Sequence, residues 1–211
     1  MQIMFADDRV IVCLKPFGVL STDEPGGMPS LLRAALGDSE AVVKNVHRLD
    51  RAVGGVMVYA RTKRAASDLG LQIRTGVFDK EYLAIVHGAP SEDHGEWEDW
   101  LLRDRARRKT EVVPPNTPEA RRAKLSWKLL RLQGDMSLLS IRLHTGRTHQ
   151  IRSQLSARGL PIVGDRKYGS ADGTENVALW SHKIAFMHPR DKSKLVFTHD
   201  APNTYPWDMF S

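Results

Sequence analysis

Residues 143–152 read LHTGRTHQIR, and a shorter string, HRLD, occupies residues 47–50. The longer string begins at the end of an apolar, strand-like run. Thr148 is placed to cap a helix whose apolar face would carry Ile151 and Leu155 one turn apart. This stretch therefore predicts a strand, a turn that contains basic residues, and a short helix.

The rest of the chain alternates between strand-like and helix-like segments. Apolar patterns and turn residues predict strands at 9–14, 54–60, 78–87, 123–132 and 138–143, helices at 29–37 and 62–76, and β-structure again from 178 to 197. No internal repeat, low-complexity tract or linker divides the chain. We therefore expect one α+β domain, residues 1–211, with a mixed, largely antiparallel sheet and flanking helices.

The composition is that of a soluble globular protein. Of 211 residues, 41% are hydrophobic and 27% are charged, which is enough apolar material for a real core. The single cysteine, Cys13, excludes an internal disulfide and a Cys-based metal site, and it favours a reducing cytoplasm. We expect neither secretion nor membrane insertion, because the amino terminus lacks a basic n-region and no apolar stretch approaches about 18 residues.

The positive charge is concentrated in one segment. The net charge is +6, and residues 101–131 hold ten Lys and Arg against three Asp and Glu, so this segment is +7 and the remainder −1. Turn residues and prolines predict a protruding basic loop or hairpin insertion at about 91–122. With tryptophans nearby, such an arm could bind a polyanion, since phosphate neutralisation releases counterions and aromatic rings stack on bases. A solvated charged hairpin is the alternative.

Several common functional signatures are absent from the sequence. There is no GxxxxGK[ST] phosphate loop, no GxSxG elbow and no GxGxxG fingerprint. There is no HExxH zinc motif, and His144 and His149, five residues apart, would not share a helix face. Nucleotide hydrolysis, serine hydrolysis and dinucleotide redox chemistry are disfavoured, and we expect no metal or cofactor.

What remains is an ordered set of motifs: KPFG at 15–18, HRLD at 47–50, KEYLAIVHG at 80–88, LHTGRTHQIR at 143–152, GLPIVGD at 159–165 and YG at 168–169. In this order and spacing, from near residue 3 to about residue 202, the chain resembles the RluA-type RNA pseudouridine synthases. The resemblance implies their catalytic fold with a central basic cleft. It also implies an isomerase that converts uridine in ribosomal or transfer RNA to pseudouridine, with RNA as its partner and no obligatory protein partner. The first strand begins within about ten residues of Met1, so we expect no amino-terminal S4-type domain.

The resemblance also assigns three catalytic residues. Asp50 falls on the family's catalytic aspartate, a carboxylate that can attack the sugar or the base and leave again, or stabilise a glycal-like intermediate. Tyr82 matches the tyrosine that packs against the target base. Arg147 matches the basic residue that pairs with the aspartate and keeps it ionised and oriented.

Further residues are expected to hold the substrate. Arg48 would contact the RNA backbone or fill the vacancy left by a flipped nucleotide, and Leu179 would line the other side of the base. Arg105, Arg107 and Arg108 of the basic segment would bind the RNA through its phosphates.

The chain departs from the family pattern at three places. Val53 and Gly54 stand where the family usually has Thr and Ser, Gln154 where histidine is common, and Trp180-Ser181 where His-Ala is usual. The lost hydroxyls leave two alternatives open. One is a catalytically silent RNA-binding module, and the other is modification of a residue other than uridine.

Overall fold

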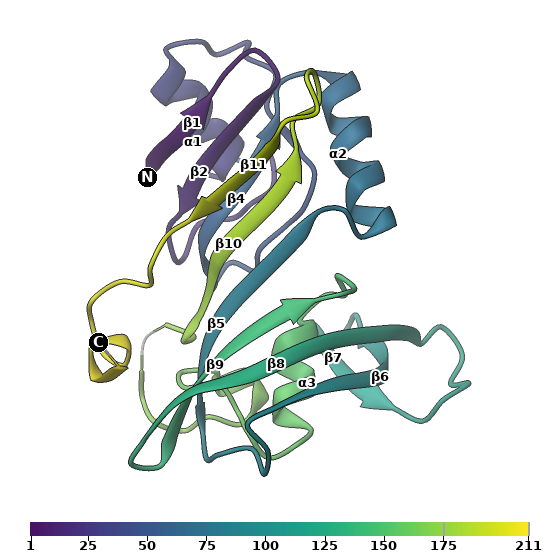
Figure 1. The fold of residues 1–211 in the computed structure, drawn as a ribbon, viewed down its shortest axis with the longest axis vertical. Helices are drawn as coiled ribbons and strands as arrows, with labels where there is room; N and C mark the ends of the chain where they lie inside the picture. The colour runs from purple at the N-terminus through teal and green to yellow at the C-terminus, as the bar shows by residue number, and fades with distance from the viewer. Residues whose placement is uncertain (175, 211) are drawn as a thin grey trace. The chain divides into compact units, whose positions relative to one another are not determined.

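The chain folds as two compact units in a computed structural model that describes residues 1–174 and 176–210. Unit 1 comprises residues 1–80 and 180–200, and unit 2 comprises residues 81–179 and 201–211 (Figure 1). Both units combine strands with helices, so the predicted α+β class is confirmed. That the two units act as one domain stays a prediction.

Unit 1 is built on a mixed sheet. Its strands β1 (Gln2–Ala6), β2 (Val10–Lys15), β4 (Gly54–Ala60) and β10 (Leu179–Met187) lie in that order, with β11 (Lys194–Thr198) paired to β10 and β3 (Lys44–Asn45) to β4. Strands β4 and β10 run parallel, and the other pairs are antiparallel. The predicted mixed, largely antiparallel arrangement is therefore confirmed.

Two helices complete unit 1, and both were predicted. Helix α2 (Lys63–Thr75) begins where the Thr62 hydroxyl accepts a hydrogen bond from the Ala65 N–H (3.0 Å) and ends at Gly76, whose φ of 76° is left-handed. Its Ala65 and Leu69 pack on Val56 and Val58 of β4. Helix α1 (Met28–Leu36) has a proline in its first turn and ends at a left-handed glycine. Every residue of β4 is buried, so the strand that follows the HRLD segment is held rigidly in the core.

Unit 2 is an antiparallel sheet. Its strand order is β5 (Asp79–His87), β9 (Met136–Leu143), β8 (Arg121–Gln133), β6 (His94–Asp104) and β7 (Lys109–Val113). Strand β5 begins in unit 1 and continues here. Helix α3 (Gln150–Ser156) packs against β6 and β7, the short helix η1 (Arg166–Tyr168) against α3, and the carboxyl-terminal η2 (Trp207–Phe210) against β8.

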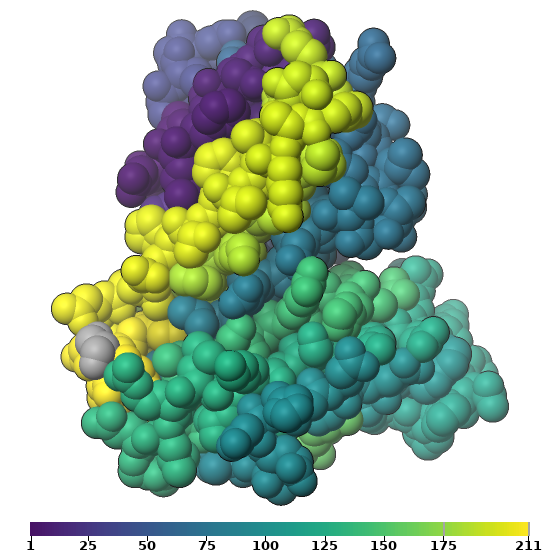
Figure 2. Space-filling view, viewed as in Figure 1, coloured from purple at the N-terminus to yellow at the C-terminus, as the bar shows by residue number. Residues whose placement is uncertain are grey.

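The segment predicted as a basic loop or hairpin contains a hairpin over residues 100–113, whereas residues 94–101 pair with β8; that the segment is an insertion stays a prediction. Strands β6 and β7 pair from Trp100 with Val113 to Asp104 with Lys109. Residues 105–108 of the turn are all exposed. The hairpin end forms the right-hand extremity of unit 2 in Figure 2.

The prediction of a helix capped by Thr148 was wrong by one residue. Helix α3 starts at Gln150, and the capping position is His149, whose backbone is left-handed (φ 53°, ψ 24°) and whose side chain makes no cap hydrogen bond. The imidazole instead bonds to Tyr168, a partner far away in the sequence. A tertiary contact has here displaced the local capping preference.

Two departures from the family pattern meet at the start of β4. Gly54 pairs with Trp180 of the parallel strand β10. A Cβ atom on Gly54 would lie 2.5 Å from the Trp180 ring, closer than packed atoms can approach. Trp180 is itself buried, and its indole N–H donates to the His199 carbonyl (2.9 Å). The missing side chain at position 54 and the large ring at position 180 are therefore complementary.

We expect Gly54→Ala to destabilise the fold by about 1–3 kcal/mol, because the added methyl group overpacks the Trp180 ring. Trp180→His should recover part of that loss in the double variant, since a smaller ring leaves room for the Cβ atom. Urea denaturation of the two single variants and the double variant measures both effects. Gly70→Ala in α2, where a new Cβ atom would meet only Arg74 at 3.5 Å, is the control. A fully additive double variant would show that the two positions are independent.

Candidate active site

Asp50 opens a tight turn that leads into β4. The Val53 N–H donates to the Asp50 carbonyl (3.0 Å), which closes the turn Asp50–Val53. Val53 is buried, and β4 follows at once. The backbone that carries the predicted nucleophile is therefore attached to a rigid strand.

A buried lysine lies under this turn. Lys15 ends β2 opposite Gly55, and its side chain is 0% exposed. Its ammonium donates to the carbonyls of Pro16 (2.9 Å), Val19 (2.6 Å) and Arg51 (3.3 Å), which matches the three protons that it carries. Burial lowers the pKa of Lys15 to about 8, and the neighbouring Asp50 carboxylate opposes that shift. At neutral pH the ammonium is therefore still mostly charged and can bind the turn.

The loop after β2 is joined to the turn by further hydrogen bonds. Gly18 N–H donates to the Arg51 carbonyl (2.8 Å), and Arg51 Nε donates back to the Gly18 carbonyl (2.8 Å). The buried Ser21 hydroxyl donates to the Leu49 carbonyl (2.9 Å). The segments 15–21 and 49–51, which contain the KPFG motif and the end of HRLD, are thus joined by hydrogen bonds. Sequence reasoning missed Lys15 and Ser21, although a lysine that ends an apolar strand run was a visible signal.

The histidine of HRLD has a structural role. His47 Nε2 accepts a hydrogen bond from the Val58 N–H (3.2 Å), and its ring packs on Phe78 with centroids 5.5 Å apart. Burial, with a smaller contribution from Lys80, lowers the pKa of His47 to about 3. The imidazole is therefore neutral at physiological pH, as its acceptor role at Nε2 requires. Arg48, the next residue, is exposed, and Leu49 is buried.

Tyr82 and Leu179 belong to neighbouring segments of unit 2. Tyr82 is a buried residue of β5, in register with Ile141 of β9. Leu179 is also buried and directly follows Ala178, whose carbonyl accepts a hydrogen bond from the Ile85 N–H (3.0 Å) of β5. The structure thus brings together two of the segments predicted to line the base.

Arg147 is held in the turn between β9 and α3. Its Nε donates to the Arg122 carbonyl (2.9 Å), and its backbone N–H donates to Gln150 Oε1 (3.0 Å). The buried Gln150 also accepts from the Thr145 hydroxyl (2.8 Å) and donates to the Lys124 carbonyl (3.1 Å). The TGRTHQIR string therefore folds around one buried amide that fixes the Arg147 backbone to β8.

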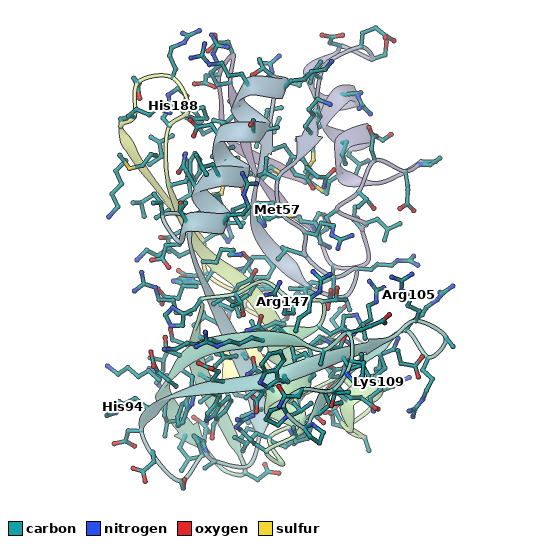
Figure 3. The ribbon with its side chains drawn as sticks, turned by 90° about the vertical axis from the view of Figure 1, so that its right-hand side faces the viewer. Met57, His94, Arg105, Lys109, Arg147 and His188 are labelled. Carbon is teal, nitrogen blue, oxygen red and sulfur yellow. The ribbon has the colours of Figure 1, made fainter. Side chains whose placement is uncertain are left out.

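The arginines of the basic segment lie together at the hairpin end. Arg105, Arg107 and Arg108 are exposed, and the Asp104 carboxylate caps the turn by accepting from the Arg107 N–H (2.9 Å). Figure 3 shows Arg105 and Lys109 near the outer end of the hairpin and Arg147 farther along unit 2.

Two of the tryptophans near the hairpin, Trp97 of β6 and Trp127 of β8, pack against each other. Trp127 is buried, and its ring lies 5.1 Å from that of Trp97, with the Arg158 guanidinium 4.4 Å above the Trp97 ring. Arg158 also pairs with Asp99 of β6 (2.9 Å). The same carboxylate accepts from Gln154 Nε2 (2.6 Å), so the glutamine that departs from the family pattern ties α3 to the hairpin.

The sequence-predicted residues divide between the two units. Asp50 and Arg48 lie in unit 1, whereas Tyr82, Arg147, Leu179 and the three hairpin arginines lie in unit 2. A pairing of Asp50 with Arg147 stays a prediction. In residues 1–174 and 176–210 no three His, Cys, Asp or Glu side chains gather as they would around a metal ion. Within the same ranges no helix has the length and apolar character needed to cross a bilayer.

Comparison with known proteins agrees with the motifs. The model of the RNA pseudouridylate synthase family matches residues 9–157. An RNA pseudouridine synthase of Synechocystis is 33% identical over 203 residues, which cover 90% of this chain and 62% of that protein. The dual-specificity RNA pseudouridine synthase RluA of Vibrio vulnificus is 30% identical, over 90% of this chain and 78% of that protein.

A solved structure shares the fold. The human RNA pseudouridylate synthase domain containing 1 superposes with a TM-score of 0.81 at 21% identity, covering 96% of this chain and 84% of that one. The chain spans 62% of the length of the Synechocystis relative and 70% of that of a relative from Aquifex aeolicus. With the family model covering most of the sequence, the resemblance seen in the motifs is confirmed, and the chain belongs to the RNA pseudouridylate synthase family.

Proposed function

We propose that this protein isomerises uridine in RNA to pseudouridine, with Asp50 as the nucleophile. The bond between uracil N1 and ribose C1′ breaks, the base turns, and a bond forms between C5 and C1′. The C5 proton is released and N1 gains a proton, so the reaction needs no redox partner and no external energy. A carboxylate that adds and then leaves can serve at C1′ or at C6.

The observation that carries the proposal is the fixed turn under Asp50. A nucleophile contributes most when its approach to the reacting atom is set in advance. The Lys15 ammonium and Gly18 hold Arg51 on one side of Asp50, and the Ser21 hydroxyl holds the Leu49 carbonyl on the other, before any RNA binds. None of these hydrogen bonds requires a side-chain hydroxyl at position 53 or 54, where the family usually has Thr and Ser.

The other residues supply binding and orientation in this proposal. Tyr82 and Leu179 pack on the two sides of the flipped base, and Arg147 pairs with the Asp50 carboxylate. Arg48 is exposed and suited to a phosphate or to the space that the flipped nucleotide leaves.

The substrate class is ribosomal or transfer RNA. One relative, from Borreliella burgdorferi, is named as a ribosomal large subunit pseudouridine synthase and is 31% identical over 85% of this chain. The chain's basic hairpin is suited to structured RNA of either kind. The expected compartment is the cytoplasm, as the single, buried Cys13 suggests.

Asp50→Asn should abolish release of tritium from RNA labelled at uridine C5. The amide keeps the shape of the carboxylate but cannot act as the nucleophile, so we expect the rate to fall by at least about 1000-fold. The assay uses RNA from cells that lack the protein, with Asp38→Asn, a change of an exposed aspartate outside the predicted site, as control.

RNA binding measured in parallel separates the alternatives. Loss of release with retained binding supports the proposal. Binding by the wild-type protein without any release would favour the silent RNA-binding module. Release that persists in Asp50→Asn would remove Asp50 from the mechanism.

The triple change of Arg105, Arg107 and Arg108 to Gln should weaken RNA binding and flatten its salt dependence. Each phosphate contact contributes about 0.9 to the slope of log K against log salt for a duplex and about 0.7 for a single strand, so the slope should fall by about 2–3. The matched control replaces Lys63, Arg64 and Arg74 of α2, which are also exposed and carry the same charge. Equal slopes of log K against log salt in the two triple variants would show that the hairpin is a solvated, charged element that does not bind RNA.

A further inference from the structure

Tyr168 is a buried tyrosine at the end of η1 that the proposed mechanism does not use. It is 4% exposed, although its hydroxyl needs hydrogen-bond partners. Two segments supply them. The Thr110 N–H of β7 donates to the hydroxyl oxygen (2.8 Å), and His149 Nδ1 lies 2.8 Å from the same oxygen. One hydroxyl therefore bridges the basic hairpin and the start of α3.

The hairpin side of this bridge is the backbone of an edge strand. Strand β7 is the last strand in the order of the unit 2 sheet, so its outer edge carries N–H groups without a strand partner. Thr110 is 2% exposed and pairs with Arg103 across the hairpin. Without the Tyr168 hydroxyl its N–H would be buried and unsatisfied, which costs more than an ordinary hydrogen bond contributes.

The other side of the bridge sets the conformation of the Arg147 turn. The Gln150 N–H donates to the Arg147 carbonyl (3.1 Å), so Thr148 and His149 form the middle of a turn. His149 has a left-handed backbone (φ 53°), which a residue with a side chain adopts only when its surroundings enforce it. The hydrogen bond between His149 and Tyr168 stabilises this conformation, and His149 lies two residues after Arg147 in the sequence.

The Tyr168 ring strengthens the same junction. The Lys109 ammonium of the hairpin lies 5.4 Å from the ring centroid and the Arg152 guanidinium of α3 lies 5.0 Å from it. Arg152 is fixed in turn by two hydrogen bonds to the buried Asp165 carboxylate (2.7 and 2.8 Å). The hairpin and α3 thus both contact Tyr168 through a cation as well as through its hydroxyl.

We propose that Tyr168 is a positioning residue that couples the basic hairpin to the Arg147 turn. This coupling fixes the position of Arg147 relative to the RNA that the hairpin binds. The proposal rests on the proposed function for its catalytic part. The coupling of the two segments is a property of the protein alone. The hydrogen bonds of the hydroxyl are responsible for the coupling, and the ring adds packing and the two cation contacts.

Tyr168→Phe tests the coupling, because it removes the hydroxyl and keeps the ring with its two cations. We expect faster amide hydrogen exchange in two segments only, around Thr110 and around residues 146–150, with protection in β8 and β9 unchanged. Tyr205→Phe, which changes an exposed tyrosine of the same unit, is the matched control and should alter neither segment. Uniformly faster exchange across unit 2, or none, would overturn the coupling.

Steady-state and binding measurements test the catalytic part. Tyr168→Phe should lower kcat at least tenfold and leave the Kd for RNA within twofold, since the hairpin arginines remain but lose their register with Arg147. His149→Asn keeps a residue that tolerates the left-handed backbone but has too short a side chain to reach Tyr168. The double variant should be no worse than Tyr168→Phe alone.

The outcomes separate the two claims. A loss of RNA affinity with unchanged kcat, or additive losses in the double variant, would overturn the positioning role. A wild-type protein that releases no tritium from any RNA would overturn the proposed function, whereas the exchange experiment would still decide whether Tyr168 couples hairpin and turn.

Discussion

A buried ammonium bound to three backbone carbonyls is the interaction on which the candidate site depends. Lys15 has no exposed surface, and the carbonyl of Arg51, next to the predicted nucleophile, is one of its acceptors. Burying a charge is costly unless hydrogen bonds replace the water that it loses. The loop after β2 and the Asp50 turn supply those hydrogen bonds together, so neither can move without exposing the charge or leaving it unsatisfied.

In unit 2 the Arg147 turn is held by buried neutral side chains instead of a buried charge. The buried Gln150 side chain bonds to the Arg147 N–H and to the Lys124 carbonyl, and the Tyr168 hydroxyl links His149 to Thr110. In both units a short irregular segment carries a candidate functional residue, Asp50 in unit 1 and Arg147 in unit 2, and buried polar groups attach that segment to a strand. Such networks hold a single geometry because every broken hydrogen bond would leave a buried group unpaired.

Local patterns predicted most of the fold and the family. The caps at Thr62 and Gly76 and the strand at 54–60 follow from residue type and periodicity, and the ordered motifs identified the family. Contacts distant in sequence were beyond such reasoning. The left-handed backbone of His149, which replaces the expected Thr148 cap, depends on the hydrogen bond to Tyr168. The glycine at position 54 is explained by the ring of Trp180, which leaves no room for a Cβ atom. The roles of Asp50, Tyr82 and Arg147 stay predictions from the motifs.

The most direct test of this account is Lys15→Met, which keeps the length of the side chain and removes its charge and donors. We predict that single-turnover pseudouridine formation falls at least about 100-fold, that RNA affinity is unchanged, and that the Gly18 amide, bonded to the Arg51 carbonyl, exchanges faster. Unchanged amide protection in β8 and β9 would show that unit 2 remains folded. A Lys15→Met protein that isomerises uridine at the wild-type rate would contradict the claim that the buried ammonium positions Asp50.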